Sequence, residues 1–297
     1  MVDVRVRQAR ADDRESVLAF CRDTWEDGDY IAEVWDRWLE DPACALLVGI
    51  VDARPVALVN MRMLSTDESW IEGLRVDPAM RQQGIGRTIV LGALAVARQR
   101  GAIVSRLFTS AQNTASQALF VAAGFEQVAA FVGQQAQAVA VALAETLPLG
   151  GALRTPPTSE LERLWAFLEA SNVAPLNGGL LVSGWRAQAL TAALLESRLA
   201  AGEVWTLEAW ETVQALAIAQ PRVRSERGPR LSVQYLDGTA EGIGRLSLAL
   251  RGEAARQGLA AVTAIVPDTL MLHDAMLGAG YAPNDYGVVW CYARSLR

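Results

Sequence analysis

The chain has 297 residues, of which 52% are hydrophobic and 20% are charged, and its formal net charge is −6. This length and composition predict a packed, soluble protein with room for two domains rather than a disordered chain. The net negative charge argues against a nucleic-acid-binding protein, which normally presents a basic face. With a single histidine, His273, and three widely spaced cysteines, we expect no metal site of Cys/His type.

No apolar stretch reaches the roughly 18 residues that a membrane-spanning helix needs. Residues 1–7 alternate like a strand and lack the apolar core of a signal peptide. We therefore expect a cytoplasmic protein. Its oligomeric state is expected to be a monomer or a homodimer.

The hydrophobic pattern of the first half predicts, in chain order, a strand at 3–9, helices at 12–25 and 30–40, and strands at 45–51, 55–64 and 69–76. A helix at 85–100, a strand at 103–108, a helix at 114–123 and two strands near 125–143 are expected to follow. In the helix at 30–40, Ile31, Val34, Trp35 and Trp38 recur at helical spacing. This spacing favours an apolar stripe packed on the sheet.

Residues 70–88, Trp-Ile-Glu-Gly-Leu-Arg-Val-Asp-Pro-Ala-Met-Arg-Gln-Gln-Gly-Ile-Gly-Arg-Thr, are the most informative segment. They read as a strand, a glycine loop and the start of a long helix. Gly84 and Gly86 let backbone N–H groups converge on an anion, and the positive end of the helix points to the same place. Arg81 and Arg87 add positive charge. The segment therefore predicts a site for a phosphate or pyrophosphate.

Two well-known phosphate motifs do not fit this segment. The Rossmann fingerprint needs a third glycine, and the Walker motif needs a lysine, which this chain lacks entirely. The segment resembles instead motif A of the GNAT superfamily of N-acyltransferases, Arg/Gln-x-x-Gly-x-Gly/Ala after a strand ending Leu-x-Val-x-Pro. Residues 113–125, Asn-Thr-Ala-Ser-Gln-Ala-Leu-Phe-Val-Ala-Ala-Gly-Phe, also resemble a later block of that family. The resemblance covers roughly residues 3–143 and implies an α/β fold, with a mixed, mostly antiparallel sheet flanked by helices.

The resemblance implies acetyl-CoA as the cofactor. The matching positions for its binding are Leu74, Arg75, Val76, Arg81, Gln82, Gln83, Gly84, Ile85, Gly86, Arg87, Thr88, Asn113 and Phe120. Within this set, Leu74, Arg75 and Val76 would pair by backbone with the pantetheine arm, because the family splays its fourth and fifth strands. Asn113 is a helix N-cap, a cofactor ligand or both. Phe120 stands where the family often has the tyrosine that protonates the departing thiolate, and phenylalanine cannot do so.

Glu72 lies on the strand that leads into the glycine loop. Family members that read Leu-Glu-x-x-x-Val carry a catalytic glutamate at this position, so Glu72 is the candidate general base. The alternative is an ordinary solvated glutamate on a strand. Its position beside the motif favours the catalytic interpretation.

The acceptor site is harder to place. Glu26, Asp27, Asp29 and Tyr30 precede the helix at 30–40. They form either a pocket for a cationic amine or a capped, solvated turn. The Asp-Tyr and Trp-x-x-Trp-Leu-x-x-Pro segments also resemble the histidine-type N-acetyltransferase branch of the family, which acetylates free amino acids. This second resemblance covers short segments only.

The second half repeats landmarks of the first. Glu241-Gly-Ile-Gly-Arg echoes Gln83-Gly-Ile-Gly-Arg, and Gly280-Tyr281 falls where Gly124-Phe125 would map, at an offset of about 156–158 residues. Thr239 replaces Arg81, Thr269 replaces Asn113, and Glu241 adds a carboxylate where the pyrophosphate would bind. We therefore expect tandem GNAT-like domains, at 1–146 and 158–297, joined by a linker at 147–157, with the second domain degenerate.

These observations predict an acetyl-CoA-dependent N-acetyltransferase that acts on the primary amine of a small molecule. The transfer would be direct, with Glu72 as base. The alternative is a non-catalytic module that binds or senses acyl-CoA and uses its second domain for assembly. A carboxylate at the thioester favours the enzyme, because a module that only binds has no need of one.

Overall fold

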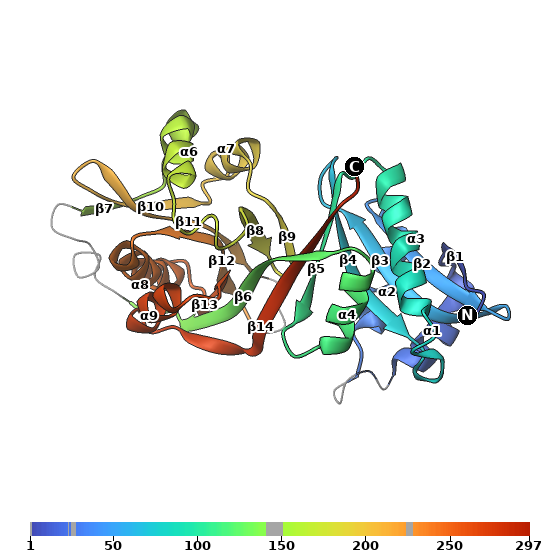
Figure 1. The fold of residues 1–297 in the computed structure, drawn as a ribbon. Helices are drawn as coiled ribbons and strands as arrows, with labels where there is room; N and C mark the ends of the chain where they lie inside the picture. The colour runs from blue at the N-terminus through green and yellow to red at the C-terminus, as the bar shows by residue number, and fades with distance from the viewer. Residues whose placement is uncertain (1, 23, 25–27, 141–150, 224–227) are drawn as a thin grey trace. The chain divides into compact units, whose positions relative to one another are not determined.

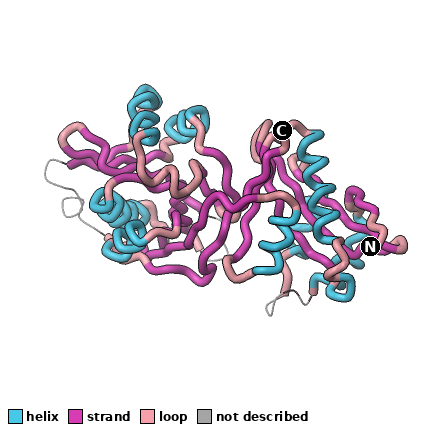
Figure 2. The backbone as a smooth tube through the Cα atoms, viewed as in Figure 1, coloured by secondary structure: helices cyan, strands magenta, loops and turns pink. Residues whose placement is uncertain are grey.

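The structure is a computed structural model that describes residues 2–22, 24, 28–140, 151–223 and 228–297. The chain forms two compact units, which we treat separately. Unit 1 contains residues 1–127 and 292–297, and unit 2 contains residues 128–291. Figures 1 and 2 show that each unit has a layer of strands flanked by helices.

Unit 1 follows the order of elements expected from the sequence. Its strands are β1 (Arg5–Gln8), β2 (Cys44–Val51), β3 (Arg54–Met63), β4 (Glu68–Val76) and β5 (Val104–Ser110), and β6 (Glu126–Gln137) begins in it. Its helices are α1 (Arg14–Cys21), α2 (Ile31–Glu40), α3 (Ile85–Gln99) and α4 (Thr114–Ala122), with short 3₁₀ turns at Ala11–Asp13 and Pro78–Met80. The strands lie in the order β1-β2-β3-β4-β5, antiparallel except for the parallel pair β4 and β5.

Helices cover both faces of the unit 1 sheet, which explains why β2 and β3 are apolar along nearly their whole length. On one face, α1 and α2 pack against Cys44, Leu46, Val48 and Leu58. The expected stripe of α2 lies here, with Trp35 fully buried and Trp38 2% exposed. On the other face lies α3, whose Ile89 side chain approaches Gly49 of β2.

Unit 2 contains β7 (Gly151–Arg154), α6 (Leu161–Glu169), β8 (Leu180–Ser183), β9 (Arg186–Ala189), α7 (Ala192–Ala200), β10 (Val204–Ala209), β11 (Thr212–Arg222), β12 (Arg230–Gly238), α8 (Ala240–Arg256), β13 (Ala261–Pro267), α9 (Leu270–Gly278) and β14 (Ala282–Ser295). A 3₁₀ turn at Thr158–Glu160 precedes α6. Helices α6 and α7 pack on one face of its sheet, and α8 and α9 pack on the other.

The order of elements in unit 2 repeats that of unit 1, apart from the added hairpin β8–β9. The match extends to detail. The β2–β3 turn places Asp52 and Ala53 at positive φ, and the β10–β11 turn does the same with Trp210 and Glu211, 158 residues later. Two successive residues at positive φ are typical of a type I′ hairpin turn, which here contains no glycine. The structure thus agrees with a repeated fold.

Two strands are divided between the units. The residues of β6 from Val128 onward belong to unit 2, where they pair antiparallel with β13. Conversely, Tyr292–Arg297, which include the end of β14, belong to unit 1. There the backbone N–H of Leu296 donates to Ile103 O over 2.9 Å, and Nε of Arg98 donates to Leu296 O over 2.7 Å.

This division differs from the linear boundaries read from the sequence. Residues 126–137 form a single strand rather than the start of a hairpin, because their continuation pairs in unit 2. The expected linker at 147–157 falls partly outside the described residues, and Gly151–Arg154 of it form β7, paired with β10. All three cysteines are buried and free. In the described part of the chain, no helix is both long and apolar enough to cross a bilayer.

Removal of residues 292–297 should destabilise unit 1, because Tyr292 and Leu296 are buried there. Burial of a side chain such as Leu296 contributes about 1.5–3 kcal/mol. We expect a lower thermal unfolding midpoint, measured by circular dichroism or calorimetry. Deletion of the exposed Arg297 alone is the matched control and should leave the midpoint in place. Equal midpoints for all three proteins would show that this segment does not stabilise unit 1.

Candidate functional site

Strands β4 and β5 are paired over only part of their length. Glu68–Trp70 pair in parallel with Val104–Arg106, whereas β4 continues to Val76 and β5 to Ser110. Beyond Trp70, the edge of β4 that faces β5 has no strand partner among the described residues. Backbone N–H and C=O groups along such an edge are available to an extended ligand.

A bulge in β4 coincides with this opening. The register with β3 shifts between Leu58 and Asn60, so that Gly73 and Leu74 lie opposite the single residue Val59. Gly73 has a φ of 68°, and a Cβ there would lie 2.6 Å from the ring of Trp38. Only glycine fits this position without rearrangement.

The glycine loop connects β4 to α3, and its two glycines have different roles. Gly84 is the N-cap of α3 with a φ of 82°, and a Cβ added to it would meet nothing within 4 Å. The space above Gly84 is therefore open. A Cβ at Gly86 would lie 2.6 Å from Leu119 of α4. Gly86 thus allows α3 and α4 to pack closely, and its part in anion binding stays a prediction.

The start of α3 can bind an anion. Gly84 offers no side chain to cap the helix, so the first N–H groups of α3 lack a capping oxygen from the N-cap residue. Arg81, Gln82 and Thr88 are exposed around the same turn, and Gln83 is half-buried. Arg87 is also exposed, but its Nε donates to Ala122 O at the end of α4 over 2.9 Å. The helix dipole and the backbone, with Arg81 beside them, are chemically suited to an anion.

Asn113 and Phe120 lie at opposite ends of α4. Asn113 is the N-cap, and its Oδ1 accepts a hydrogen bond of 3.0 Å from the N–H of Ser116. Phe120 is only 5% exposed and packs edge-on against Phe125, with ring centroids 5.7 Å apart. The capping role of Asn113 is therefore observed directly, while Phe120 is a core side chain.

Glu72 lies on β4, two residues beyond the last residue paired with β5. Its side chain is half-buried, and its Oε1 accepts a hydrogen bond of 3.0 Å from Nδ2 of Asn60 on β3. Asn60 is fully buried, and sequence reasoning did not identify it. An asparagine within the otherwise apolar run of β3 was the signal that could have found it.

The expected acceptor residues are only partly described. Glu26 and Asp27 lie outside the described residues. Asp29 forms a bidentate ion pair with Arg75, with 2.6 Å from Nε to Oδ2 and 3.1 Å from Nη2 to Oδ1. Burial alone would raise the pKa of Asp29, but the hydrogen bonds and charge of Arg75 lower it. The carboxylate is charged but already neutralised, and the side chain of Arg75 is directed to Asp29.

Tyr30 borders the same ion pair. Its ring lies 5.4 Å from Cζ of Arg75 and packs edge-on against Trp38, with centroids 6.1 Å apart. Tyr30 remains 42% exposed and therefore presents an aromatic surface near Glu72. Burial raises the pKa of its hydroxyl, and the charge of Glu72 adds to the increase.

The corresponding place in unit 2 has lost the loop. Only Thr239 separates β12 from α8, whereas residues 77–84 connect β4 to α3. Gly242 and Gly244 consequently lie inside α8 rather than in a loop. A Cβ at Gly242 would lie 2.4 Å from Gln214 O, and one at Gly244 would lie 3.1 Å from Ala275 O. These glycines allow close packing, so the sequence echo does not form a second phosphate loop.

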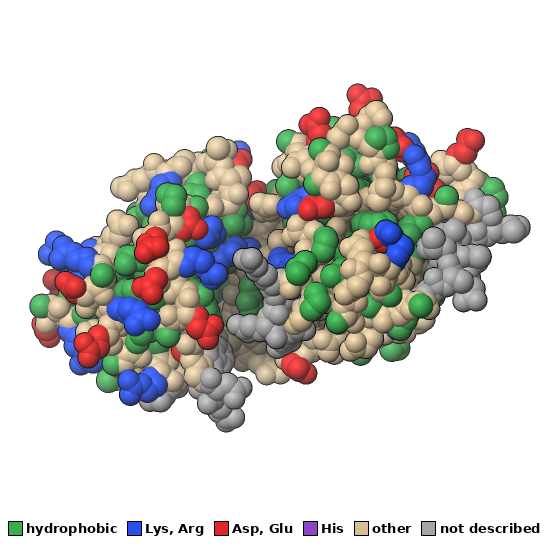
Figure 3. All heavy atoms as spheres, turned by 180° about the vertical axis from the view of Figure 1, so that it is seen from behind, with side chains coloured by type: hydrophobic (Ala, Val, Ile, Leu, Met, Phe, Trp, Pro, Cys, Tyr) green, Lys and Arg blue, Asp and Glu red, His purple; other side chains and the backbone are tan. Residues whose placement is uncertain are grey.

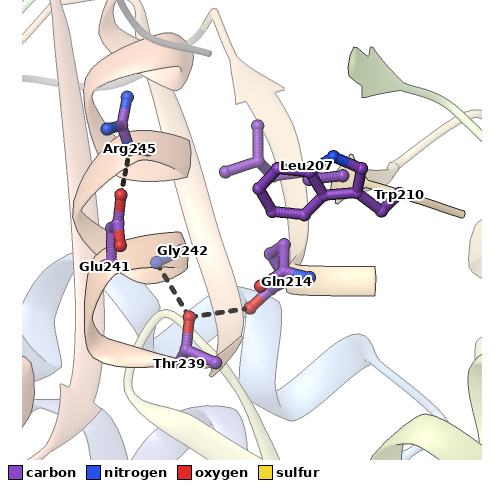
Figure 4. Close-up of a pocket in the computed structure, with 8 residues that line it drawn as sticks. Leu207, Trp210, Gln214, Thr239, Glu241, Gly242 and Arg245 are labelled. Carbon is purple, nitrogen blue, oxygen red and sulfur yellow. Dashed lines mark hydrogen bonds and ion pairs between the residues drawn. The ribbon is translucent and has the colours of Figure 1, made fainter. Parts of the chain in front are cut away.

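The start of α8 is also capped. Oγ1 of Thr239 accepts a hydrogen bond of 3.0 Å from the N–H of Gly242, and Glu241 is paired with Arg245. Figure 4 shows these groups beside a hollow of about 90 Å³, with Trp210 and Leu207 on its other side. A capped helix with a carboxylate in its first turn is unfavourable for a pyrophosphate.

Strand pairing also identifies the unit 2 counterpart of Glu72. Glu68 of β4 begins the pairing with Val104, and Arg230 of β12 begins the pairing with Ala261. Counting four residues onward from each places Gln234 at the position of Glu72. An amide at this position cannot accept a proton as a carboxylate does. Unit 2 therefore keeps the fold without the base.

Gly84→Asp should abolish coenzyme A binding, because a carboxylate at the start of α3 would repel the phosphates. We expect the dissociation constant from titration calorimetry to rise on the order of a hundredfold or more. Gly84→Asn is the matched control, since asparagine has the same shape and tolerates the same φ. Equal losses in both variants would attribute the effect to conformation instead of charge.

Titration of the full chain with coenzyme A should saturate at one molecule per chain. The open loop of unit 1 has no counterpart in unit 2, where Thr239 caps the helix and Glu241 adds negative charge. Calorimetry or equilibrium dialysis measures this stoichiometry. A value of two would contradict our interpretation of the second unit.

Part of the chain is similar to a known protein family. Residues 9–125 match the family described as Acetyltransferase (GNAT) family. The chain is 29% identical over 137 residues to the aminoglycoside N(6′)-acetyltransferase type 1 of Klebsiella aerogenes. This alignment covers 42% of this chain and 90% of that protein.

Solved structures extend the similarity to both units. A GCN5-related N-acetyltransferase from Sphaerobacter thermophilus has a TM-score of 0.61 and 14% identity, and the alignment covers 100% of this chain and 98% of that one. A tandem GNAT protein from the clavulanic acid biosynthesis pathway has a TM-score of 0.51 and 14% identity, with 99% of both chains covered. At these identities the similarity concerns the fold. The expected fold class, a mixed sheet flanked by helices in each of two units, is confirmed.

Proposed function

We propose that this chain, which belongs through residues 9–125 to the acetyltransferase (GNAT) family and is an N-acetyltransferase, transfers an acetyl group from acetyl-CoA to the primary amine of a small molecule. Unit 1 carries the reaction, with Glu72 as general base. The observation that carries the proposal is the opening between β4 and β5, with Glu72 on one side of it and the uncapped start of α3 beyond the end of β4.

The residues of unit 1 fit acetyl-CoA. The start of α3 and Arg81 would hold the pyrophosphate, for which the open space above Gly84 leaves room. The edge of β4 at Leu74, Arg75 and Val76, beyond the pairing with β5, would hydrogen-bond the pantetheine arm. Acetyl-CoA would supply the thioester as an activated acyl donor. The chain's own contribution is to hold donor and amine in attack geometry and to accept a proton.

Glu72 is suited to accept that proton from the amine. Its carboxylate is half-buried, and the N–H of Asn60 fixes one of its oxygens. As the amine nitrogen bonds to the carbonyl carbon, the ammonium proton passes to Glu72, directly or through water. Phe120 cannot protonate the departing thiolate. A thiol with a pKa near 8.5 is an acceptable leaving group without such help.

Several amines are candidate acceptors. The Klebsiella relative is named for aminoglycosides, and the similarity to the histidine-type branch suggests free amino acids. Asp29 offers a cationic amine little uncompensated charge, because Arg75 neutralises it. Tyr30, with its exposed ring, is a better candidate than Asp29 for contact with the acceptor amine. A thiol-release screen over free amino acids, polyamines and aminoglycosides tests these classes.

Glu72→Gln should lower turnover on the order of 10²–10⁴-fold, because the amide cannot accept the amine proton. Affinity for coenzyme A, measured by calorimetry, should change little. Glu126→Gln, at an exposed carboxylate at the start of β6, is the control and should retain full turnover.

The wild-type rate should rise with pH as a base is deprotonated, with no decline on the basic side from a tyrosine acid. If no amine gives turnover above thioester hydrolysis while coenzyme A still binds tightly, the alternative of a sensing module replaces this proposal.

A further inference from the structure

We propose that Asn60 is a positioning residue that holds the carboxylate of Glu72 in the orientation needed for proton transfer. This inference rests on the proposed function of Glu72 and adds a second residue to its machinery. Asn60 touches neither donor nor acceptor and acts only through Glu72.

The sheet places the two side chains next to each other. Asn60 of β3 lies directly opposite Glu72 of β4 in the antiparallel ladder. Opposite residues project from the same face of a sheet, with Cβ atoms roughly 4.5–5.5 Å apart. This pair is the first one beyond the β4 bulge. Their hydrogen bond of 3.0 Å is thus fixed by strand register rather than by a flexible loop.

The hydrogen-bonding groups of Asn60 are arranged for donation. Nδ2 donates to Glu72 Oε1 and, over 3.5 Å, to Sγ of Cys44 on β2. Oδ1 is buried and has no hydrogen-bond partner among the described atoms. Turning the amide over would place Oδ1 against the carboxylate, where two acceptors would face each other. The carboxylate therefore determines the orientation of the amide.

Stability alone does not explain an asparagine at this position. Asn60 is fully buried, and so are Leu58, Val59 and Met61 around it on β3. An apolar side chain would leave no buried oxygen without a partner. The amide is useful at this position because Glu72 needs a donor.

Unit 2 provides an internal comparison. Ala57 pairs with Val76 and Ala215 pairs with Gly238, which aligns β3 with β11 at an offset of 158 residues. The counterpart of Asn60 is then Ile218, a fully buried member of the cluster beneath α6 and α7. Ile218 pairs with Tyr235, and Gln234, the residue in place of Glu72, falls at the bulge next to that pair. The donor and the carboxylate are absent together.

Several other described groups lie near Glu72. Cys44 faces it from β2, and burial raises the pKa of that thiol, so it is uncharged near neutral pH. Tyr30 faces it from the turn before α2 as a neutral phenol with a raised pKa. The charge of Arg75 is compensated by Asp29. The hydrogen bond from Asn60 differs from these contacts because strand register sets it directly.

The experiment is a double-mutant cycle in the full chain, with the amine that gives the highest turnover in the thiol-release screen as acceptor. Asn60→Leu should lower kcat on the order of ten- to a hundredfold, the loss expected for one hydrogen bond to a charged group, with KM nearly unchanged. The loss should therefore appear in kcat and not in KM. In the Glu72→Gln background, Asn60→Leu should have no further effect.

Two controls separate positioning from folding. Met61→Leu changes a buried neighbour on the same strand and should leave kcat unchanged. Asn60→Ala serves as a second donor-free variant if Asn60→Leu does not fold, and coenzyme A affinity reports that unit 1 is intact.

The inference is overturned if Asn60→Leu leaves kcat unchanged, or if it lowers kcat by the same factor with and without Glu72. If Glu72→Gln itself retains full turnover, the proposed base fails and this inference fails with it. If Glu72→Gln lowers kcat but the Asn60 variants do not, Glu72 remains the proposed base and only the positioning role of Asn60 is wrong.

Discussion

The early end of pairing between β4 and β5 is the constraint on which the rest of the site depends. A sheet that continued its ladder would satisfy every backbone group on β4 and leave nothing for a ligand. Here the ladder stops after Trp70, and the bulge at Gly73 follows within three residues. The rigid part of the sheet still fixes Glu72 through β3. One edge of a single strand can therefore combine a firm base with an accessible backbone.

Much of this arrangement could be predicted from the sequence. The glycine motif and the hydrophobic periods located nearly every element of unit 1, because these signals are local. The separate reasons for Gly84 and Gly86 could not be read locally, since Leu119 reaches Gly86 from a different helix. The Asp29–Arg75 ion pair was missed for the same reason, since it joins residues 46 positions apart. The second Gly-Ile-Gly segment suggested a second loop, but its local sequence does not distinguish a loop from a helix. The segment that lies at the start of α3 in unit 1 lies within α8 in unit 2.

The two units show how few changes separate a fold with the candidate site from one without it. Both keep the same order of elements, apart from the β8–β9 hairpin, and the same conformation in the β2–β3 and β10–β11 turns. Unit 2 lacks the loop before its long helix and has Gln234 and Ile218 where unit 1 has Glu72 and Asn60. None of these changes disturbs the apolar clusters that hold the sheet to its helices. Stability and chemistry therefore depend on largely separate sets of residues, and one set can be lost while the other remains.

The division of β14 has a consequence for how the protein is made. Unit 1 needs residues 292–297, which the ribosome synthesises only after all of unit 2. Domains of ordinary connectivity fold one after another as they emerge, with the amino-terminal domain first. Here the edge of the unit 1 sheet at β5 would lack residues 292–297 throughout translation of unit 2. An exposed edge of this kind invites wrong pairing, so the catalytic unit would be the more vulnerable of the two to aggregation during synthesis. Folding of unit 1 is coupled to synthesis of residues 292–297, and a transcript cut short within unit 2 would yield no finished unit 1.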